Sequence, residues 1–129
     1  MHRIVDAMNV IGSRPDGWWR DRPGAIAQLL ELLERRAAAG GERLTVVLER
    51  RPEELAAVER VEVAWAPGGG RDAADEEIVR RLPEWLAADP EVVVVTSDRE
   101  LARRARELGA GVEPAGAFRR ALDEEEEKG

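Results

Sequence analysis

The sequence contains no cysteine and no tyrosine, and it has a single histidine, His2, and a single lysine, Lys128. Without cysteine the chain has no disulfide framework, no thiolate nucleophile and no cysteine-ligated zinc. A Ser-His-Asp triad needs a histidine beside the serine, and His2 lies next to the N-terminus. A P-loop or a Schiff-base enzyme needs an internal lysine, which this sequence lacks. The plentiful reactive groups are therefore carboxylates and guanidiniums, which favours carboxylate acid–base chemistry or a Mg²⁺ or Mn²⁺ site.

The length and the charge distribution predict one domain followed by an acidic tail. The chain has 129 residues, 43% of them hydrophobic, which is enough for one buried core. The net charge is −7, and much of the acid lies in residues 123–127 (DEEEE). We expect a domain over residues 1–122 and a tail over 123–129 that is either a solvated helix end or disordered. No signal-peptide pattern or membrane-length apolar run is found, so we expect a cytoplasmic protein.

Apolar segments of strand type alternate with amphipathic segments along the chain. Strands are predicted at residues 4–5, 44–48, 61–66, 92–95 and 111–113. Helices are predicted at residues 25–39, 52–58, 72–88, 97–109 and 117–122, with a kink or break at Pro83 and a capping box formed by Ser97 and Glu100. Four consecutive valines at 92–95 indicate a strand buried on both faces. The pattern predicts an α/β fold, a three-layer sandwich around a doubly wound, mainly parallel sheet.

Acidic and polar residues follow the predicted strands. They are Asp6 at the end of the first, Glu49 after the second, Asp72 and Asp75 at the start of the helix after the third, and Ser97 and Asp98 after the fourth. The carboxyl ends of parallel strands share one edge of a sheet, where ligands bind. Crowded carboxylates repel one another unless a cation lies between them, and Mg²⁺ needs only one or two of them. A divalent metal site at this edge is therefore predicted.

Most of these residues also have a purely structural interpretation. Asp98 is placed to complement the dipole of the following helix, and Asp72 and Asp75 have the spacing of a capping pair. Asp6 is harder to explain in this way, because an unpaired carboxylate among apolar residues is costly. Asn9 approaches Asp6 only if the chain turns directly after the strand, where it would brace the loop or hold a metal-bound water.

Three segments resemble the motifs of NYN-domain proteins, which have the PIN-like ribonuclease fold, in the YacP-like bacterial branch. They are residues 4–13 (IVDAMNVIGS), 71–79 (RDAADEEIV) and 94–101 (VVTSDREL), in the family's order. The resemblance implies a parallel sheet and an acidic pocket that binds Mg²⁺ or Mn²⁺ and cleaves RNA. It implies Asp6, Asp75 and Asp98 as catalytic and metal-binding residues, supported by Asn9, Asp72 and Ser97.

The chain departs from the family's pattern at two places. Ala7 stands where a glycine is common, and the pair Glu49 and Arg50 stands where an aspartate–glycine pair is common. Glu49 is best explained as a solvated strand end. Neither departure removes one of the three acids, but both affect the loops beside the predicted pocket.

The first long loop combines arginines with two adjacent tryptophans. Guanidinium groups pair with phosphates and indoles stack on bases, so this loop suits single-stranded RNA. We expect one of the two tryptophans, Trp18 or Trp19, to pack against the core instead. Arg71 and Arg99 lie near the same edge of the sheet. The predicted RNA-binding residues are Arg14, Trp18, Arg20, Arg22, Arg71 and Arg99.

The leading hypothesis is a metal-dependent endoribonuclease that cleaves single-stranded RNA with a metal-activated water. The alternative is an RNA-binding or ribosome-associated module with weak or no catalysis. A phosphatase-like enzyme with an aspartate nucleophile is disfavoured, because it needs a second aspartate shortly after the first and, usually, a lysine. RNA is the expected partner under both remaining hypotheses, and the ribosome is a candidate partner.

Overall fold

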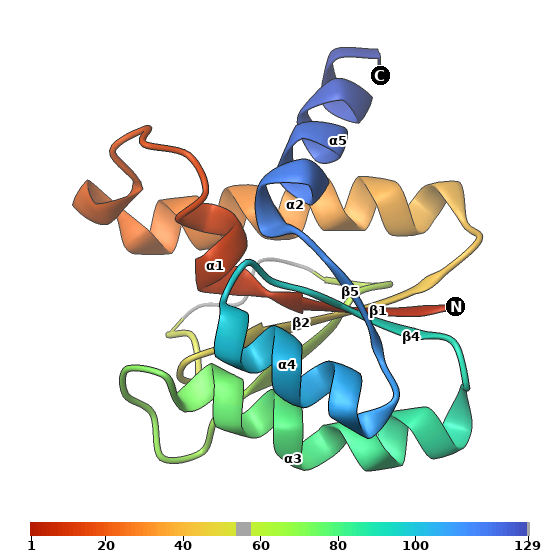
Figure 1. Cartoon of the computed structure of the whole chain (residues 1–129). Helices are drawn as coiled ribbons and strands as arrows, with labels where there is room; N and C mark the ends of the chain where they lie inside the picture. The colour runs from red at the N-terminus through yellow and green to blue at the C-terminus, as the bar shows by residue number, and fades with distance from the viewer. Residues whose placement is uncertain (54–57, 129) are drawn as a thin grey trace.

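In the computed structural model, which describes residues 1–53 and 58–128, a five-stranded sheet lies between two layers of helices (Figure 1). All neighbouring strands are parallel. The strands are β1 (His2–Asp6), β2 (Arg43–Leu48), β3 (Glu62–Trp65), β4 (Val92–Val95) and β5 (Gly111–Glu113). The helices are α1 (Ala7–Ile11), α2 (Arg22–Ala39), α3 (Ala73–Ala88), α4 (Arg99–Leu108) and α5 (Ala115–Lys128), with a 3₁₀ turn η1 (Trp18–Arg20). The predicted α/β fold with a parallel sheet is confirmed.

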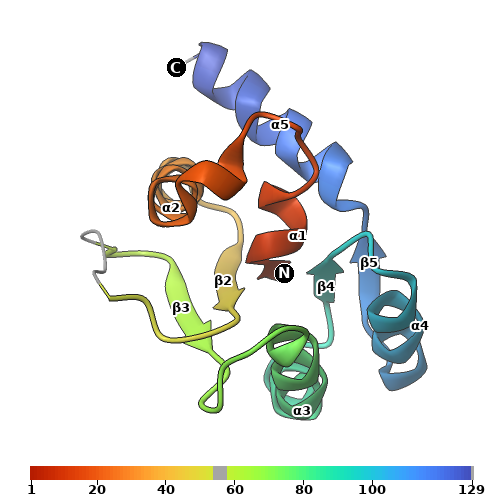
Figure 2. The same ribbon diagram turned by 90° about the vertical axis from the view of Figure 1, so that its left-hand side faces the viewer.

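The strand order is β3-β2-β1-β4-β5, so β1 occupies the centre of the sheet. Helices α1, α2 and α5 cover one face, and α3 and α4 cover the other (Figure 2). From β1 the chain reaches β2 through α2 on the first face, and from β3 it reaches β4 through α3 on the second. The sheet is thus wound in both directions from its centre, which is the arrangement of a doubly wound fold.

Each face of the sheet buries its own set of side chains. Val5 and Val95 pack on the side of α2 and α5, whereas Ile4 and Val94 pack on the side of α3 and α4. Phe118 of α5 is fully buried on the first of these sides. Because both faces are covered, β4 is a continuous apolar run, as the valines at 92–95 predict.

The helices differ from the sequence prediction in several of their bounds. A short helix, α1, follows β1 directly where only a turn is predicted. Helix α2 begins at Arg22 rather than at residue 25, because Asp21 accepts a hydrogen bond from the Gly24 N–H at 3.0 Å and Pro23 is tolerated in the first turn. Helix α3 continues through Pro83, so of the predicted kink or break, the break is wrong.

Helix α5 continues to Lys128, so residues 123–128 form a helix end rather than a disordered segment. Asp123 belongs to the packed part of this helix, because it forms ion pairs with Arg14 and Arg119. The predicted helix at 52–58 falls largely on residues 54–57, outside the described residues. No helix in the described parts of the chain is long and apolar enough to cross a membrane.

Candidate active site

The carboxyl ends of β1 and β4 meet where the winding of the sheet reverses. Val5 pairs with Val95, so Asp6, the last residue of β1, lies beside Thr96, the first residue after β4. Beyond this point one connection leads toward β2 and the other toward β5, on opposite sides of the sheet's centre. In open parallel sheets this reversal is the place where ligands bind.

Asp6 is only 4% exposed, and a hydroxyl group holds its carboxylate. Thr96 Oγ1 donates to Asp6 Oδ2 at 3.1 Å, and it accepts a hydrogen bond from the Asp98 N–H at 3.1 Å. The Thr96 hydroxyl therefore links the Asp6 carboxyl to the start of α4.

Thr96 is a site residue that the sequence analysis does not identify. Its only signal is its place between the valine run and Ser97-Asp98, and many buried threonines end strands without any function. The structure shows that its hydroxyl joins Asp6 to the backbone of Asp98.

Asn9 and Ser97 brace the connection between β4 and α4. The Ser97 N–H donates to Asn9 Oδ1 at 2.7 Å, which places Asn9 of α1 against this connection. Ser97 Oγ accepts a hydrogen bond from the Ala115 N–H at 2.9 Å. The predicted capping box of Ser97 and Glu100 is wrong, because the hydroxyl is used by α5 and the N-cap of α4 is Asp98.

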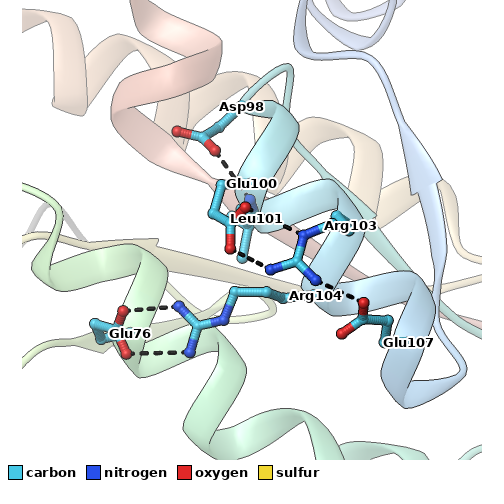
Figure 3. Close-up of polar contacts among 7 residues, drawn as sticks. All are labelled: Glu76, Asp98, Glu100, Leu101, Arg103, Arg104 and Glu107. Carbon is cyan, nitrogen blue, oxygen red and sulfur yellow. Dashed lines mark hydrogen bonds and ion pairs between the residues drawn. The ribbon is translucent and has the colours of Figure 1, made fainter.

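Asp98 caps α4 through its side chain. Its Oδ1 accepts a hydrogen bond from the Leu101 N–H at 2.9 Å (Figure 3). One carboxylate oxygen is thus used by the helix, and Oδ2 makes no hydrogen bond with the described residues. The capping role fixes the direction in which the carboxylate points.

Asp75 lies in the first turn of α3 and is half-buried. Asp72, the residue before α3, is exposed and has a left-handed backbone conformation with φ of 64°. Among the described residues it is the only non-glycine with positive φ. Its side chain makes no capping hydrogen bond, so the predicted capping pair of Asp72 and Asp75 is wrong.

The electrostatics couple the three aspartates. Burial, followed by the charge of Asp75, raises the pKa of Asp6 from its ordinary 3.8 to about 7, and Asp98 adds a smaller increase. The Thr96 hydroxyl opposes this rise in the pKa of Asp6. Burial, followed by the charges of Asp98 and Asp72, raises the pKa of Asp75 to about 6. The charge of Asp75 thus acts on Asp6, and the charge of Asp98 acts on Asp75, as repulsion between nearby carboxylates requires.

Three ion pairs lie on α3 and α4, beside Asp75 and Asp98. Arg104 of α4 bridges to Glu76 of α3, with Arg104 Nη1 at 2.7 Å from Glu76 Oε1 (Figure 3). Arg103 pairs with Glu100 and Glu107 on its own helix. Arg104 lowers the pKa of Asp75, but Glu76 offsets its charge. Among the described residues, none of Asp6, Asp75 and Asp98 forms an ion pair with an arginine.

The donor set is made of oxygen atoms, which suits Mg²⁺ or Mn²⁺. Among residues 1–53 and 58–128, no group of three or more Asp, Glu or His side chains is arranged to hold a metal ion. The site is thus not a closed cage. Mg²⁺ needs only one or two carboxylates and completes its shell with water and phosphate, so the aspartates fit a hydrated cation.

The predicted RNA-binding arginines fall into two groups. Arg14 is engaged, because its guanidinium pairs with Asp123 at 2.5 Å and with Asp16 at 3.3 Å. The exposed residues Arg20, Arg22, Arg71 and Arg99 take part in none of the ion pairs formed by the described residues. The second group therefore remains available for phosphate, and Arg14 does not.

Trp18 and Trp19 have different surroundings. Trp18 is half-buried and packs against the core on the side of α2. Trp19 is 52% exposed. One of the two is thus a core residue, as expected, but the indole available for stacking is that of Trp19 and not the predicted Trp18.

Comparison with known proteins identifies the family. The sequence model of the YacP-like NYN domain matches residues 3–129. The chain belongs to this family. The family assignment inferred from the three motifs is thereby confirmed, and the YacP-like NYN chain is a nuclease-like domain.

Solved structures share the YacP-like fold. The crystal structure of Rae1 (YacP) from Bacillus subtilis matches with a TM-score of 0.77 and 23% identity, over 99% of this chain and 76% of that chain. A tryptophan-to-leucine mutant of Rae1 matches with a TM-score of 0.81 and 22% identity, over 98% of this chain and 77% of that chain. At these identities the likeness shows the fold. No curated protein matches the sequence.

Proposed function

We propose that this chain is an endoribonuclease that cleaves single-stranded RNA, depends on Mg²⁺ or Mn²⁺, and uses Asp6, Asp75 and Asp98 as catalytic residues. The observation that carries the proposal is the buried carboxyl of Asp6, whose pKa is raised to about 7 beside two further aspartates at the winding reversal. Strongly perturbed acids at such a place are typical of functional sites. Membership of a nuclease-like family supports the same reaction class.

The side chains have distinct roles in this proposal. Asp6, Asp75 and Asp98 would hold the cation, with Asp72, Asn9 and Ser97 in supporting positions. When bound, Mg²⁺ or Mn²⁺ lowers the pKa of a water and offsets the negative charge of a phosphate. Arg71 and Arg99, exposed beside the acids in the sequence, suit the phosphates of the RNA.

Asp6 would bind the cation in its charged form, because a carboxylate that ligates a metal must be deprotonated. The cation would therefore displace the proton that the raised pKa of Asp6 favours in the metal-free protein. With one histidine on the opposite edge of the sheet and no internal lysine, carboxylates are the side chains left to hold a cation.

A second candidate function is an RNA-binding or ribosome-associated module without catalysis. The absence of a ready group of three metal-binding side chains among the described residues favours it. The exposed arginines around the sheet edge serve binding equally well in this case.

Asp98→Asn separates the two functions. Asparagine keeps the side-chain oxygen that caps α4 but loses the charge, so the variant should fold. Its cleavage rate should fall by at least about 100-fold, because replacing a residue that only supports metal ligands already lowers activity by up to about that factor. Its affinity for RNA should be equal or slightly higher, because one repulsion against phosphate is gone. Glu107→Gln, at the far end of the same helix, is the matched control and should cleave like wild type.

The measurement is cleavage and binding of one labelled single-stranded RNA, with Mn²⁺ and with EDTA. If wild type binds RNA but shows no Mn²⁺-dependent cleavage that Asp98→Asn removes, the binding module replaces the nuclease. If wild type neither binds nor cleaves, both functions are rejected.

A further inference from the structure

The loop between α1 and α2 presents an indole ring to solvent on a rigid support. Trp19 is 52% exposed, and its ring meets that of Trp18 edge to face, with ring centres 5.9 Å apart and planes at 86°. Trp18 in turn packs against the core residues beneath α2. The exposed ring is therefore attached to the core and loses little conformational freedom when a ligand stacks on it.

Two arginines flank this aromatic pair. The Arg20 guanidinium lies 5.9 Å from the centre of the Trp19 ring, and that of Arg22 lies 5.3 Å from the Trp18 ring. Asp21 lies between them in the sequence, and its carboxylate accepts the Gly24 N–H at the start of α2. In a chain of net charge −7 this loop thus combines an exposed aromatic face with two guanidiniums that no described acid neutralises.

We infer that Trp19, Arg20 and Arg22 form a base-stacking platform for single-stranded RNA. The inference rests on the proposed function to the extent that RNA is the ligand. An indole offers its face to any unpaired base, and adjacent guanidiniums pair with the phosphates on either side of that base. A duplex hides its base faces, so the platform selects single strands.

The surface is less suited to a protein partner. Stable protein interfaces bury about 800 Å² on each partner around a connected apolar centre. Among the described residues the large exposed apolar side chains are Met1, Trp19 and Leu108. Met1 and Leu108 lie at the opposite edge of the sheet, at the start of β1 and the end of α4, so Trp19 has no apolar neighbours of this kind.

The platform and the acids lie on different sides of the sheet. Trp19 belongs to the layer of α2, whereas Asp75 belongs to α3 on the other face, and Figure 2 shows these two helices on opposite sides of the sheet. A strand that contacts both must cross the edge of the sheet. The platform therefore contributes to the binding of longer single strands and is not reached by a ligand confined to the acids.

The experiment measures binding of a labelled oligouridine in EDTA, so that no cleavage is needed. Trp19→Ala should weaken binding about 10-fold, the scale of one base–indole stack, and Trp19→Phe should restore most of it. Leu108→Ala is the matched control and should bind like wild type. An oligomer with the same backbone but without bases should bind wild type and Trp19→Ala equally weakly.

Salt dependence tests the arginines separately. Arg20→Ala and Arg22→Ala should each lower the slope of log affinity against log salt by about 0.7, the value for one phosphate of a single strand. Arg106→Ala, an exposed arginine near the far end of α4, should leave the slope unchanged.

The outcomes distinguish this inference from the proposed function. Loss of affinity in Trp19→Ala without any Mn²⁺-dependent cleavage by wild type keeps the platform and rejects the nuclease. Equal affinity of wild type and Trp19→Ala for oligouridine, or equal affinity of wild type for the oligomers with and without bases, overturns the platform. Self-association that Trp19→Ala abolishes, without RNA binding, would assign the indole to a protein contact instead.

Discussion

Replacing Asp6 with asparagine is expected to change how the stability of the metal-free protein depends on pH. The pKa of Asp6 is about 7 in the folded state, against an ordinary value of 3.8. Between these values the folded protein keeps a proton that the unfolded chain releases. The free energy of unfolding therefore falls as pH rises through this window, and the loss is complete above about pH 7.

The magnitude follows from the two pKa values. Their difference corresponds to about 4 kcal/mol, and because the residue is 4% exposed, solvent screening reduces it little. The stability of Asp6→Asn relative to wild type should thus increase by about 4 kcal/mol between about pH 4 and pH 8. The buried amide adds an offset that is the same at every pH, so the pH dependence is the quantity to compare.

The assay is urea unfolding in EDTA at a series of pH values, followed by tryptophan fluorescence. Asp75, whose pKa is also raised, contributes a dependence of its own between about pH 4 and 6 in both proteins. Over this range Asp6 keeps its proton and is as neutral as the asparagine that replaces it, so the Asp75 contribution largely cancels in the difference. Asp16→Asn, at an exposed position in the loop after α1, is the control and should track wild type. A difference between Asp6→Asn and wild type that stays constant with pH would refute the argument that the Asp6 carboxyl is buried against other acids.

Three further predictions follow from the same contacts. Mn²⁺ should raise the melting temperature of wild type but not that of Asp6→Asn, because a cation bound among the acids stabilises only the folded state. An equal rise in both proteins would place the cation elsewhere, for example at the acidic end of α5. Thr96→Val should lower the free energy of unfolding by about 1–3 kcal/mol in urea. It should also move the pH profile of cleavage upward, because the hydroxyl that lowers the pKa of Asp6 is lost. Unchanged stability and an unchanged profile would contradict the role of Thr96 as the hydrogen-bond partner of Asp6. Truncation after Leu122 removes Asp123, the partner of buried Arg119, and should lower the free energy of unfolding by about 3 kcal/mol. Truncation after Asp123 keeps this ion pair, so it should change the stability little and should tighten RNA binding because it removes acidic residues. Equal stability of the two truncated chains would contradict the ion pair.

The sequence was informative where a single physical requirement dominates. A run of four valines satisfies only a strand covered on both faces, so it predicted the buried β4. An aspartate directly after two apolar residues of a strand predicted an unusual carboxyl at the sheet edge. Asp6 is indeed buried there, and the strand-end rule led to Asp75 and Asp98 in the same region.

Prediction failed where neighbouring residues are chemically equivalent. Ser97 and Asp98 are both good N-caps, and α5 decides between them because the Ala115 N–H occupies the Ser97 hydroxyl. Trp18 and Trp19 are the same residue type, and only the packing of the folded loop shows which ring is covered. Local sequence does not contain these tertiary contacts.

The backbone at the start of α3 also escaped prediction. The spacing of Asp72 and Asp75 is that of a capping pair, but Asp72 adopts a left-handed conformation in which its side chain does not reach the helix. Helix α1 was missed for a related reason, since its five residues show neither a side-chain cap nor a complete amphipathic period.

The hydrogen bond between Thr96 and Asp6 joins residues that are 90 positions apart in the chain. Parallel pairing of β1 with β4 requires closure of this long loop, and long-range pairing of this kind slows folding. A chain still under synthesis, or one cut before β4, therefore has Asp6 but no partner for it. Because Asp98 follows β4, the three acids come together only when the central strands have paired, and no shorter N-terminal fragment contains the complete site.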